Sequence, residues 1–408
     1  MSKIPKIRFK GFTDAWEQRK LGDIAEVTKL AGFEFTEHVV YSDAGNIIAL
    51  RGLNIKNGQL ILDDVKYIDG SNFSKLNRSK LFIDDIMFTY VGTVGEVAII
   101  KENNRFYLAP NVSRIRVQSN DSPKFISHYM RTDNFKNKVI FSLIATSSQP
   151  ALSMENIRKF MINMPKNRDE QDRLAEYFDH LDHLITLHQR KCDNMKKIKK
   201  FMLQKMFPKK GEKFPEIRFE GFTDAWEQRK LGEVFQEYSE KNHPELPVLT
   251  IIQGGGTVLR DESDRNLQYD KSSLSGYKMI CKNDFIVHLR SFEGGLEKSN
   301  HNGLISPAYH TFHGDDVDPR FYYPYFRSYE FIKHKLVPHV YGIRDGRSID
   351  VTGMKTIQIP WTLYEEQKKI GNYIESLDHL ITLHQRKSDE LKEMKKYMLQ
   401  NMFPDGRK

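Results

Sequence analysis

Residues 181–208 read LDHLITLHQRKCDNMKKIKKFMLQKMFP, and residues 377–404 read LDHLITLHQRKSDELKEMKKYMLQNMFP. The two stretches are identical at 21 of 28 positions and lie 196 residues apart. Apolar side chains recur every seven residues through both stretches and for some turns before them, with a second series four residues on. Heptads sustained over five repeats are typical of coiled-coil helices. The sequence therefore predicts two long helices, over about 168–206 and about 365–402.

The two predicted helices are expected to pair with each other in an antiparallel arrangement. They share one seam, and only antiparallel pairing relates the two halves of the chain by a pseudo-twofold. At 1.5 Å per residue, helices of roughly 40 residues would be about 60 Å long. The alternative is that each helix packs only on its own half, which a strict heptad of this length disfavours. The seam positions expected to pack are Leu174, Phe178, Leu181 and Ile185 in the first helix, and Ile370, Ile374, Leu377 and Ile381 in the second.

A second repeat opens each half of the chain. Residues 5–24, PKIRFKGFTDAWEQRKLGDI, return at 215–234 as PEIRFEGFTDAWEQRKLGEV, with 16 of 20 positions identical. Thr13 or Asp14, or their second copies, could cap a short helix in this motif. If the halves are symmetric, the first motif should lie near the end of the second helix, which brings the two chain ends together.

The stretches between these repeats do not match each other in sequence. Each carries short β-type runs such as IMFTYVG (86–92) and KNDFIVHL (282–289), separated by Gly, Asn and Asp, with a helix expected near 123–143. The predicted fold class is α+β, with two recognition domains of mixed α/β structure separated by the antiparallel coiled-coil pair. The predicted divisions are an opening motif (1–24), a first domain (25–166), a first spacer helix (167–208), a linker with the second motif (209–234), a second domain (235–362) and a second spacer helix with tail (363–408).

Composition narrows the class of partner. Lys and Arg number 63 against 54 Asp and Glu, a net charge of +9, which favours a polyanion such as nucleic acid. No apolar run is long enough for a membrane span and no signal peptide opens the sequence, so we expect no membrane partner. The two cysteines, Cys192 and Cys281, cannot form a disulfide framework, and a reducing, cytoplasmic setting is expected.

Motifs for catalysis are missing from the sequence. There is no GxxxxGK[ST] loop for a nucleoside triphosphate and no His/Cys cluster with metal spacing. The glycines in VGTVGE (91–96) and IIQGGGTV (251–258) do not form a cofactor fingerprint, and a strand followed by glycines is usually a turn. We therefore expect no catalytic residues, no bound cofactor and no metal in this chain.

Polar loops in both inserts supply the candidates for DNA contact. Arg, Ser, Tyr, Asn and Gln side chains interleaved with Gly suit both phosphate anchoring and contacts to base edges, although an ordinary surface loop is the simpler interpretation for any single residue. The candidates are Thr89, Tyr90, Asn111, Arg114, Ser147, Ser148 and Gln149 in the first insert, and Arg290, Ser291, Ser306, Tyr309, Tyr341, Arg344 and Arg347 in the second.

The duplicated FTDAWEQRKLG motif and LDHLITLHQRK…MFP helix, flanking dissimilar inserts, together resemble the DNA-specificity (S) subunit of type I restriction–modification systems. The strings DFIVHLRSFEGG (284–295) and GLISPAY (303–309) also resemble one variety of target recognition domain, and DIMFTYVGTVGEVAII (85–100) resembles another. The resemblance covers essentially the whole chain. It implies a non-catalytic subunit that binds double-stranded DNA and carries two modification subunits, which bind S-adenosylmethionine and methylate adenine N6. Two restriction subunits could join that core.

Two recognition domains on a paired-helix spacer should read a bipartite, asymmetric DNA site with a fixed gap. Half-sites on one side of the duplex need a spacing near one helical turn, about 34–36 Å. Two other classes stay open on the residues alone. A free-standing DNA-modifying enzyme would need catalytic motifs that are missing, and a coiled-coil adaptor without a DNA role would not need the basic balance.

Overall fold

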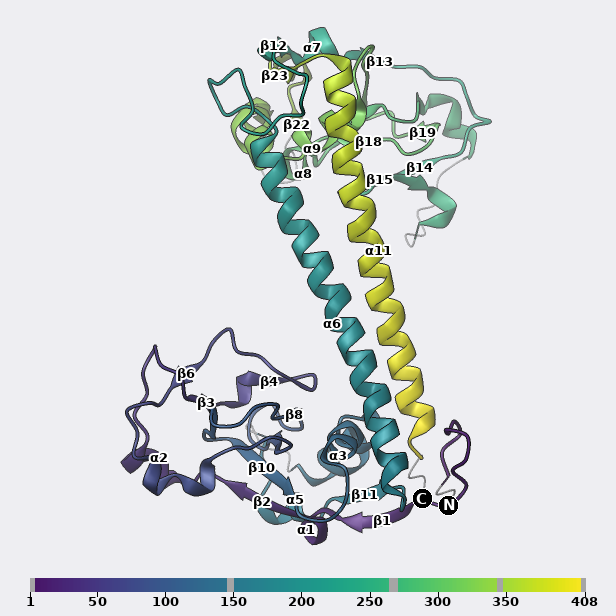
Figure 1. Ribbon diagram of the computed structural model, residues 1–408. Helices are drawn as coiled ribbons and strands as arrows, with labels where there is room; N and C mark the ends of the chain where they lie inside the picture. The colour runs from purple at the N-terminus through teal and green to yellow at the C-terminus, as the bar shows by residue number, and fades with distance from the viewer. Residues whose placement is uncertain (1–3, 145–149, 264–270, 343–347, 405–408) are drawn as a thin grey trace. The chain divides into compact units, whose positions relative to one another are not determined.

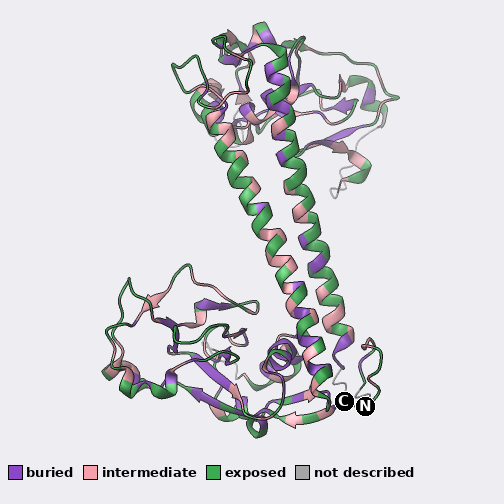
Figure 2. Cartoon of the chain, viewed as in Figure 1, coloured by how far each residue is buried: buried purple, intermediate pink, exposed green. Residues whose placement is uncertain are grey.

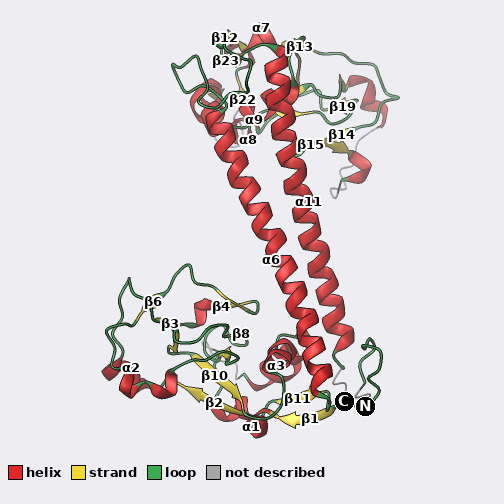
Figure 3. Cartoon of the chain, in the orientation of Figure 1, coloured by secondary structure: helices red, strands yellow, loops and turns green. Residues whose placement is uncertain are grey.

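The structure, a computed structural model (Figure 1), describes residues 4–144, 150–263, 271–342 and 348–404. The chain forms two compact units, residues 1–188 with 386–408, and residues 189–385. Two helices are shared by both units: α6 (Arg168–Lys205) and α11 (Tyr364–Met402), which lie where the heptads predicted helices. Strands lie outside these two helices, in the inserts and in the opening motifs (Figure 3).

The opening motif of the first unit forms a strand, and the predicted cap within it is wrong. Strand β1 (Glu17–Lys20) pairs antiparallel with β11 (Met161–Met164), which closes the insert at its base. Helix α1 (Leu21–Ile24) begins only after this strand, with Lys20 and not Thr13 or Asp14 at its N-cap. The described residues before this strand form turns and bends and no helix. The second unit repeats the arrangement with β12 (Glu227–Lys230), β23 (Gln358–Trp361) and α7 (Leu231–Val234).

The first insert is built on a four-stranded antiparallel sheet. Its order is β2 (Ala25–Lys29), β10 (Val112–Val117), β7 (Ile86–Thr89) and β8 (Val97–Ile99). Figure 2 shows buried residues along these strands, as expected for a sheet covered on both faces. A smaller sheet, a hairpin and two short helices complete the insert: β6 (Lys66–Tyr67), β3 (Ile48–Leu50) and β9 (Phe106–Leu108); β4 (Ile55–Lys56) and β5 (Gln59–Leu60); α2 (Gly32–His38) and α5 (Met154–Arg158).

The helix expected near 123–143 is interrupted. Helix α3 (Pro123–Met130) has Ser122 at its N-cap and proline in its first turn, which suits a helix start. Thr132 then adopts an extended conformation and caps a new short helix, α4 (Asp133–Phe135), by accepting a hydrogen bond from the Phe135 amide at 3.2 Å. Tighter and wider helical turns continue from Lys136 to Leu143. A capping threonine therefore divides the segment.

The second insert has the same central sheet, although its sequence does not match the first. The order is β13 (Gln236–Tyr238), β20 (His310–His313), β17 (Phe285–Val287) and β18 (Glu297–Lys298), again first strand, last strand and the two between. The remaining elements are β14 (Leu249–Ile252) with β15 (Gly256–Leu259), β16 (Lys278–Ile280) with β19 (Gly303–Ile305), β21 (Val340–Tyr341) with β22 (Ser348–Ile349), α8 (Ser291–Gly294) and α10 (Val351–Met354).

Helix α9 (Pro319–Phe326) is the counterpart of α3 and was not expected from the sequence. Two prolines in PRFYYPYF argue against a helix, but Pro319 lies in the first turn, where no backbone donor is needed. Asp318 caps the helix by accepting a hydrogen bond from the Arg320 amide at 2.8 Å. The aromatic side chains Phe321 and Tyr322 are fully buried beneath the sheet, and this packing outweighs Pro324 inside the helix.

Within each unit, the segments of α6 and α11 run antiparallel, as predicted. In the first unit Asp182 forms an ion pair with Lys395, and the rings of Phe178 and Phe403 stack with centroids 5.5 Å apart. In the second unit the Lys199 Nζ lies 2.5 Å from the Asp378 carboxylate. Since the copies are 196 residues apart, both ion pairs join the same Lys of one copy to the same Asp of the other.

The predicted seam residues pack in two directions. In the first unit they share one core with the insert and with the end of α11, around Phe125, Met402 and Phe403. In the second unit they pack with Phe321 and Met206. Each helix therefore packs on its own insert as well as on the other helix. The seam residues Leu174, Phe178, Leu181, Ile370, Ile374 and Leu377 are buried, whereas Ile185 and Ile381 are half-buried.

Candidate nucleic-acid interface

The opening motif holds the two helices of each unit together through a buried carboxylate. In the first unit Nε and Nη2 of Arg8 each donate to the Glu170 carboxylate at 2.7 Å, and the Trp16 indole donates to it at 3.3 Å. The Ile7 amide donates to the carbonyl of Asn401 at 3.0 Å, so the motif also contacts the end of α11, as expected from symmetry.

The second unit repeats these contacts. Arg218 binds the Glu366 carboxylate at 2.6 and 2.8 Å, and the Trp226 indole donates to it at 3.0 Å. The Ile217 amide donates to the Lys205 carbonyl at 2.9 Å. Sequence reasoning missed the two glutamates because it began the helix repeat at Leu181. The shared Glu-Gln pair at 170–171 and 366–367, at the same offset of 196, was the available signal.

Three of the DNA-contact candidates in the first insert have buried side chains. The Thr89 hydroxyl accepts a hydrogen bond from the Glu96 amide at 2.9 Å. Arg114 is 3% exposed, forms an ion pair with Glu26 at 3.0 Å, and has its pKa lowered by burial. Burial also raises the pKa of the Tyr90 hydroxyl. These contacts give Thr89 and Arg114 a structural role in the insert.

The other first-insert candidates differ in what the structure describes. Asn111 is exposed and has a left-handed backbone (φ 70°) at the turn before β10. Ser147, Ser148 and Gln149 lie outside the described residues. Asn111 is therefore the described candidate of this insert that presents its side chain to solvent, and its contact with DNA stays a prediction.

In the second insert, Arg290 and Tyr341 are exposed. Ser291 is buried, and its hydroxyl accepts the His288 amide at 2.9 Å, which shapes the turn into α8. Ser306 and Tyr309 are half-buried in one turn. Arg344 and Arg347 lie outside the described residues. Arg290 caps the start of α8 and Tyr341 lies in β21, so these two candidates come from different elements.

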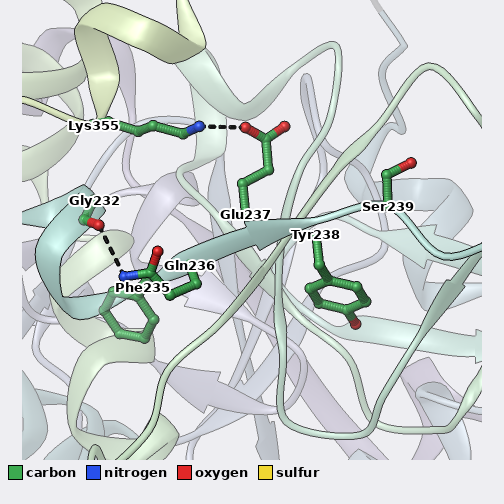
Figure 4. A pocket seen from close by; sticks show the side chains of 7 residues that line it. All are labelled: Gly232, Phe235, Gln236, Glu237, Tyr238, Ser239 and Lys355. Atoms are coloured by element: carbon green, nitrogen blue, oxygen red, sulfur yellow. Dashed lines mark hydrogen bonds and ion pairs between the residues drawn. The ribbon is translucent and has the colours of Figure 1, made fainter.

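A pocket of about 310 Å³ lies beside strand β13 and is lined by polar side chains (Figure 4). Glu237 contacts the Lys355 Nζ at 2.5 Å and the His310 Nδ1 at 2.7 Å. Burial raises the pKa of Glu237, but the hydrogen bonds from Lys355 and His310 outweigh it and lower the pKa overall. The carboxylate is thus ionised and already paired with the Lys355 ammonium group. Tyr238 points to the other face of the strand, where it donates to Asp284 at 2.6 Å.

Two further searches cover only the described residues. No helix among them is long and apolar enough to cross a membrane. No group of three or more His, Cys, Asp or Glu side chains in the described ranges could hold a metal ion.

Comparison with known proteins shows which family this chain is similar to. Residues 13–197 match the family model for the type I restriction modification DNA specificity domain. A putative type I restriction enzyme specificity subunit of Methanocaldococcus jannaschii (MjaX) is 23% identical over 410 residues, covering 96% of this chain and 93% of the relative. The MjaVIII specificity subunit of the same organism is 24% identical over 258 residues, or 59% of this chain and 60% of the relative.

A solved structure shares the fold. The crystal structure of a type I restriction–modification system S subunit from M. genitalium superposes with a TM-score of 0.63 at 13% identity, covering 99% of this chain and all of the other. At that identity the likeness concerns the fold alone. With its duplicated frame, its matching domain and a relative of similar length, the chain is similar to the DNA-specificity subunits of type I restriction–modification systems.

Proposed function

We propose that this chain is the DNA-specificity subunit of a type I restriction–modification system. It reads a bipartite, asymmetric DNA site, with one half-site assigned to each insert. The observation that carries the proposal is the contrast within the chain: the frame contacts of Glu170 and Glu366 are the same, whereas the inserts share a sheet but not a sequence. Two copies of one scaffold that hold different surfaces are suited to two different half-sites in a defined relation.

The chain is proposed to act without catalysis of its own. Two modification subunits would bind S-adenosylmethionine and methylate adenine N6, and two restriction subunits could complete the assembly. A cytoplasmic setting follows from this role, because the DNA and the partners are there. Salt-dependent DNA binding would support the net charge of +9 as part of the interface, since neutralised phosphates release counterions.

The helices are proposed to set the gap between the half-sites. They contain 38 and 39 residues, or about 57 Å at 1.5 Å per residue, which accommodates half-sites one DNA turn apart. Lengthening both helices by one turn should change the gap and leave the bases unchanged. An unchanged gap would contradict the proposal.

The main experiment expresses the full chain with its modification subunit and maps methylated adenines by sequencing. The expected result is one bipartite motif. Exchange of residues 25–166 for another first insert should change one half of the motif and preserve the other. Simultaneous change of both halves would contradict independent reading, and methyl transfer by the purified chain alone would favour a free-standing enzyme.

A further inference from the structure

A turn of the first insert is held by two charged side chains. Asn57 and Gly58 join β4 to β5, and both have left-handed backbones (φ 52° and 83°). The Asn57 amide donates to the Glu96 carboxylate at 2.6 Å, and Arg131 donates to the Asn57 carbonyl at 3.1 Å. A Cβ on Gly58 would lie 2.1 Å from the Arg131 guanidinium carbon, so only glycine lets the arginine approach this closely.

A turn of the second insert is also held by a glutamate, but here the arginine binds the carboxylate and not the turn. The amides of Gly254, between β14 and β15, and of Gly256, at the start of β15, donate to the Glu297 carboxylate at 2.7 and 3.2 Å. Arg327 forms an ion pair with that carboxylate. A Cβ on Gly254, whose φ is 82°, would lie 3.0 Å from an Arg327 nitrogen. In each insert we call the turn, its glutamate and its arginine a hairpin clamp.

The two clamps occupy equivalent places in the fold. Arg131 and Arg327 are the C-cap residues of α3 and α9, which are counterparts. Glu96 directly precedes edge strand β8, and Glu297 begins edge strand β18. The glycine strings VGTVGE and IIQGGGTV, which match no cofactor motif, supply Glu96 of one clamp and the turn of the other.

The two hairpin turns can form without the contacts of the glutamate and the arginine. Asn-Gly closes a two-residue hairpin by its own backbone preferences. Placing Glu297, which is 0% exposed, beneath a turn carries a desolvation cost that the turn alone does not require. What the clamp adds is a fixed position of the tip relative to the sheet and to the helix that supplies the arginine, as binding loops need.

The tips present groups suited to DNA. Lys56 and Asn57 are exposed at the first, and Gln253 is exposed at the second. A Cβ on Gly294 would lie 2.3 Å from the Gln253 amide nitrogen, so this side chain lies against α8, the helix whose N-cap is Arg290. Asn and Gln amides can bind adenine through two hydrogen bonds, and Lys and Arg bind phosphate.

We propose that the two clamped hairpins are base-reading elements, one for each half-site, and that Glu96 with Arg131 and Glu297 with Arg327 are positioning residues for specificity. This inference rests on the proposed function. It assigns Gln253 to the second half-site and Asn57 to the first. The clamps explain how inserts without matching sequences can present a reading turn from the same place.

The test uses the full chain with its modification subunit and measures methylation of cognate sites and of sites with single-base changes. Gln253→Ala removes an exposed amide, Glu297→Gln weakens the clamp, and Glu293→Gln, an exposed neighbour on α8, is the control. We expect the first two to lower discrimination in the second half-site by about ten- to a hundredfold. The first half-site, the gap and the control should be unchanged, and Glu96→Gln should affect the first half-site instead.

The outcomes separate the two proposals. A wild-type complex without a bipartite motif would remove the proposed function itself. A wild-type bipartite motif with unchanged discrimination in Gln253→Ala would overturn the hairpin assignment, whatever Glu297→Gln does to the fold. If Glu297→Gln lowers methylation equally at all sites, the clamp stabilises the domain and does not position a reader.

Discussion

The two units have the same side-chain contacts in the repeated frame and different side-chain contacts in the inserts. Glu170 and Glu366 each bind one arginine and one tryptophan of the opening motif. In the clamps, however, Arg131 donates to Asp182 on α6 at 3.1 Å, whereas Arg327 pairs with Glu297 inside the insert. The comparison shows that the two units keep the same side chains where the opening motif contacts the long helices. Within the inserts, backbone placement and the clamp's glutamate and arginine are shared, but the arginines have different partners.

The largest expected effect on stability comes from removing the buried carboxylate of the frame, in either unit. Glu366→Ala leaves Arg218 and the Trp226 indole without their buried carboxylate, and should lower the free energy of unfolding by about 3–5 kcal/mol. Glu170→Ala should cost as much, because its partners are the same. Urea denaturation of the full chain measures both, with exposed Glu365→Ala as the control, expected within about 0.5 kcal/mol. Clearly unequal losses would show that the frames are not equivalent.

A smaller effect should distinguish the two cross-copy ion pairs. The Asp182 side chain is 22% exposed and Asp378 is 51% exposed. Asp182→Asn should therefore cost about 2 kcal/mol, and Asp378→Asn less than about 1 kcal/mol. Chemical denaturation at pH 7 measures both, and equal costs would contradict the difference in burial.

The pH dependence of the free energy of unfolding tests the Asp182 ion pair in a second way. Burial raises its pKa, but Arg131 and Lys395 outweigh burial and lower the pKa overall. A lowered pKa in the folded state stabilises above the ordinary value near 4, and this stabilisation is lost as the pH falls through the lowered pKa. Asp182→Asn should remove this part of the acid sensitivity, measured by unfolding at a series of pH values below 5.

The smallest effect concerns the one seam position at which the copies differ in chemistry. Cys192 is buried with its Sγ 3.8 Å from the Ile381 carbonyl, whereas the buried Ser388 hydroxyl has no hydrogen-bond partner among the residues described. Ser388→Cys should stabilise by up to about 1 kcal/mol, and Cys192→Ser should destabilise by a similar amount. Thermal unfolding under reducing conditions measures both, and a loss of stability in Ser388→Cys would contradict the argument.

The frame could be predicted from the sequence because its signals are periodic and repeated. The heptads fixed both long helices nearly to the residue. The runs at 86–92 and 282–289 contain β7 and β17, but the strands are shorter than the runs, because the alternation of side chains does not mark where pairing stops. Helix α9 was missed because propensity counts Pro324 against a helix that aromatic packing stabilises.

The candidate interface was less predictable, for a physical reason. Polar side chains such as Thr89, Arg114 and Ser291 look alike in a sequence whether they face solvent or satisfy a buried backbone group. Glu96 and Glu297 act through contacts with turns 39 and 43 residues away in the chain. No local pattern encodes such a distance, and the inserts share no residues that would reveal their equivalence.

The cross-copy ion pairs also bear on how this sequence can change. Asp182 contacts Lys395, and Lys199 contacts Asp378, so each copy of the helix is the binding partner of the other. A substitution in one copy must stay compatible with the residues of the other copy that it contacts. Each copy therefore limits the divergence of the other. The inserts carry no such mutual constraint. Mutual selection of this kind accounts for a duplicated helix that keeps 21 of 28 positions beside inserts that have lost all visible likeness.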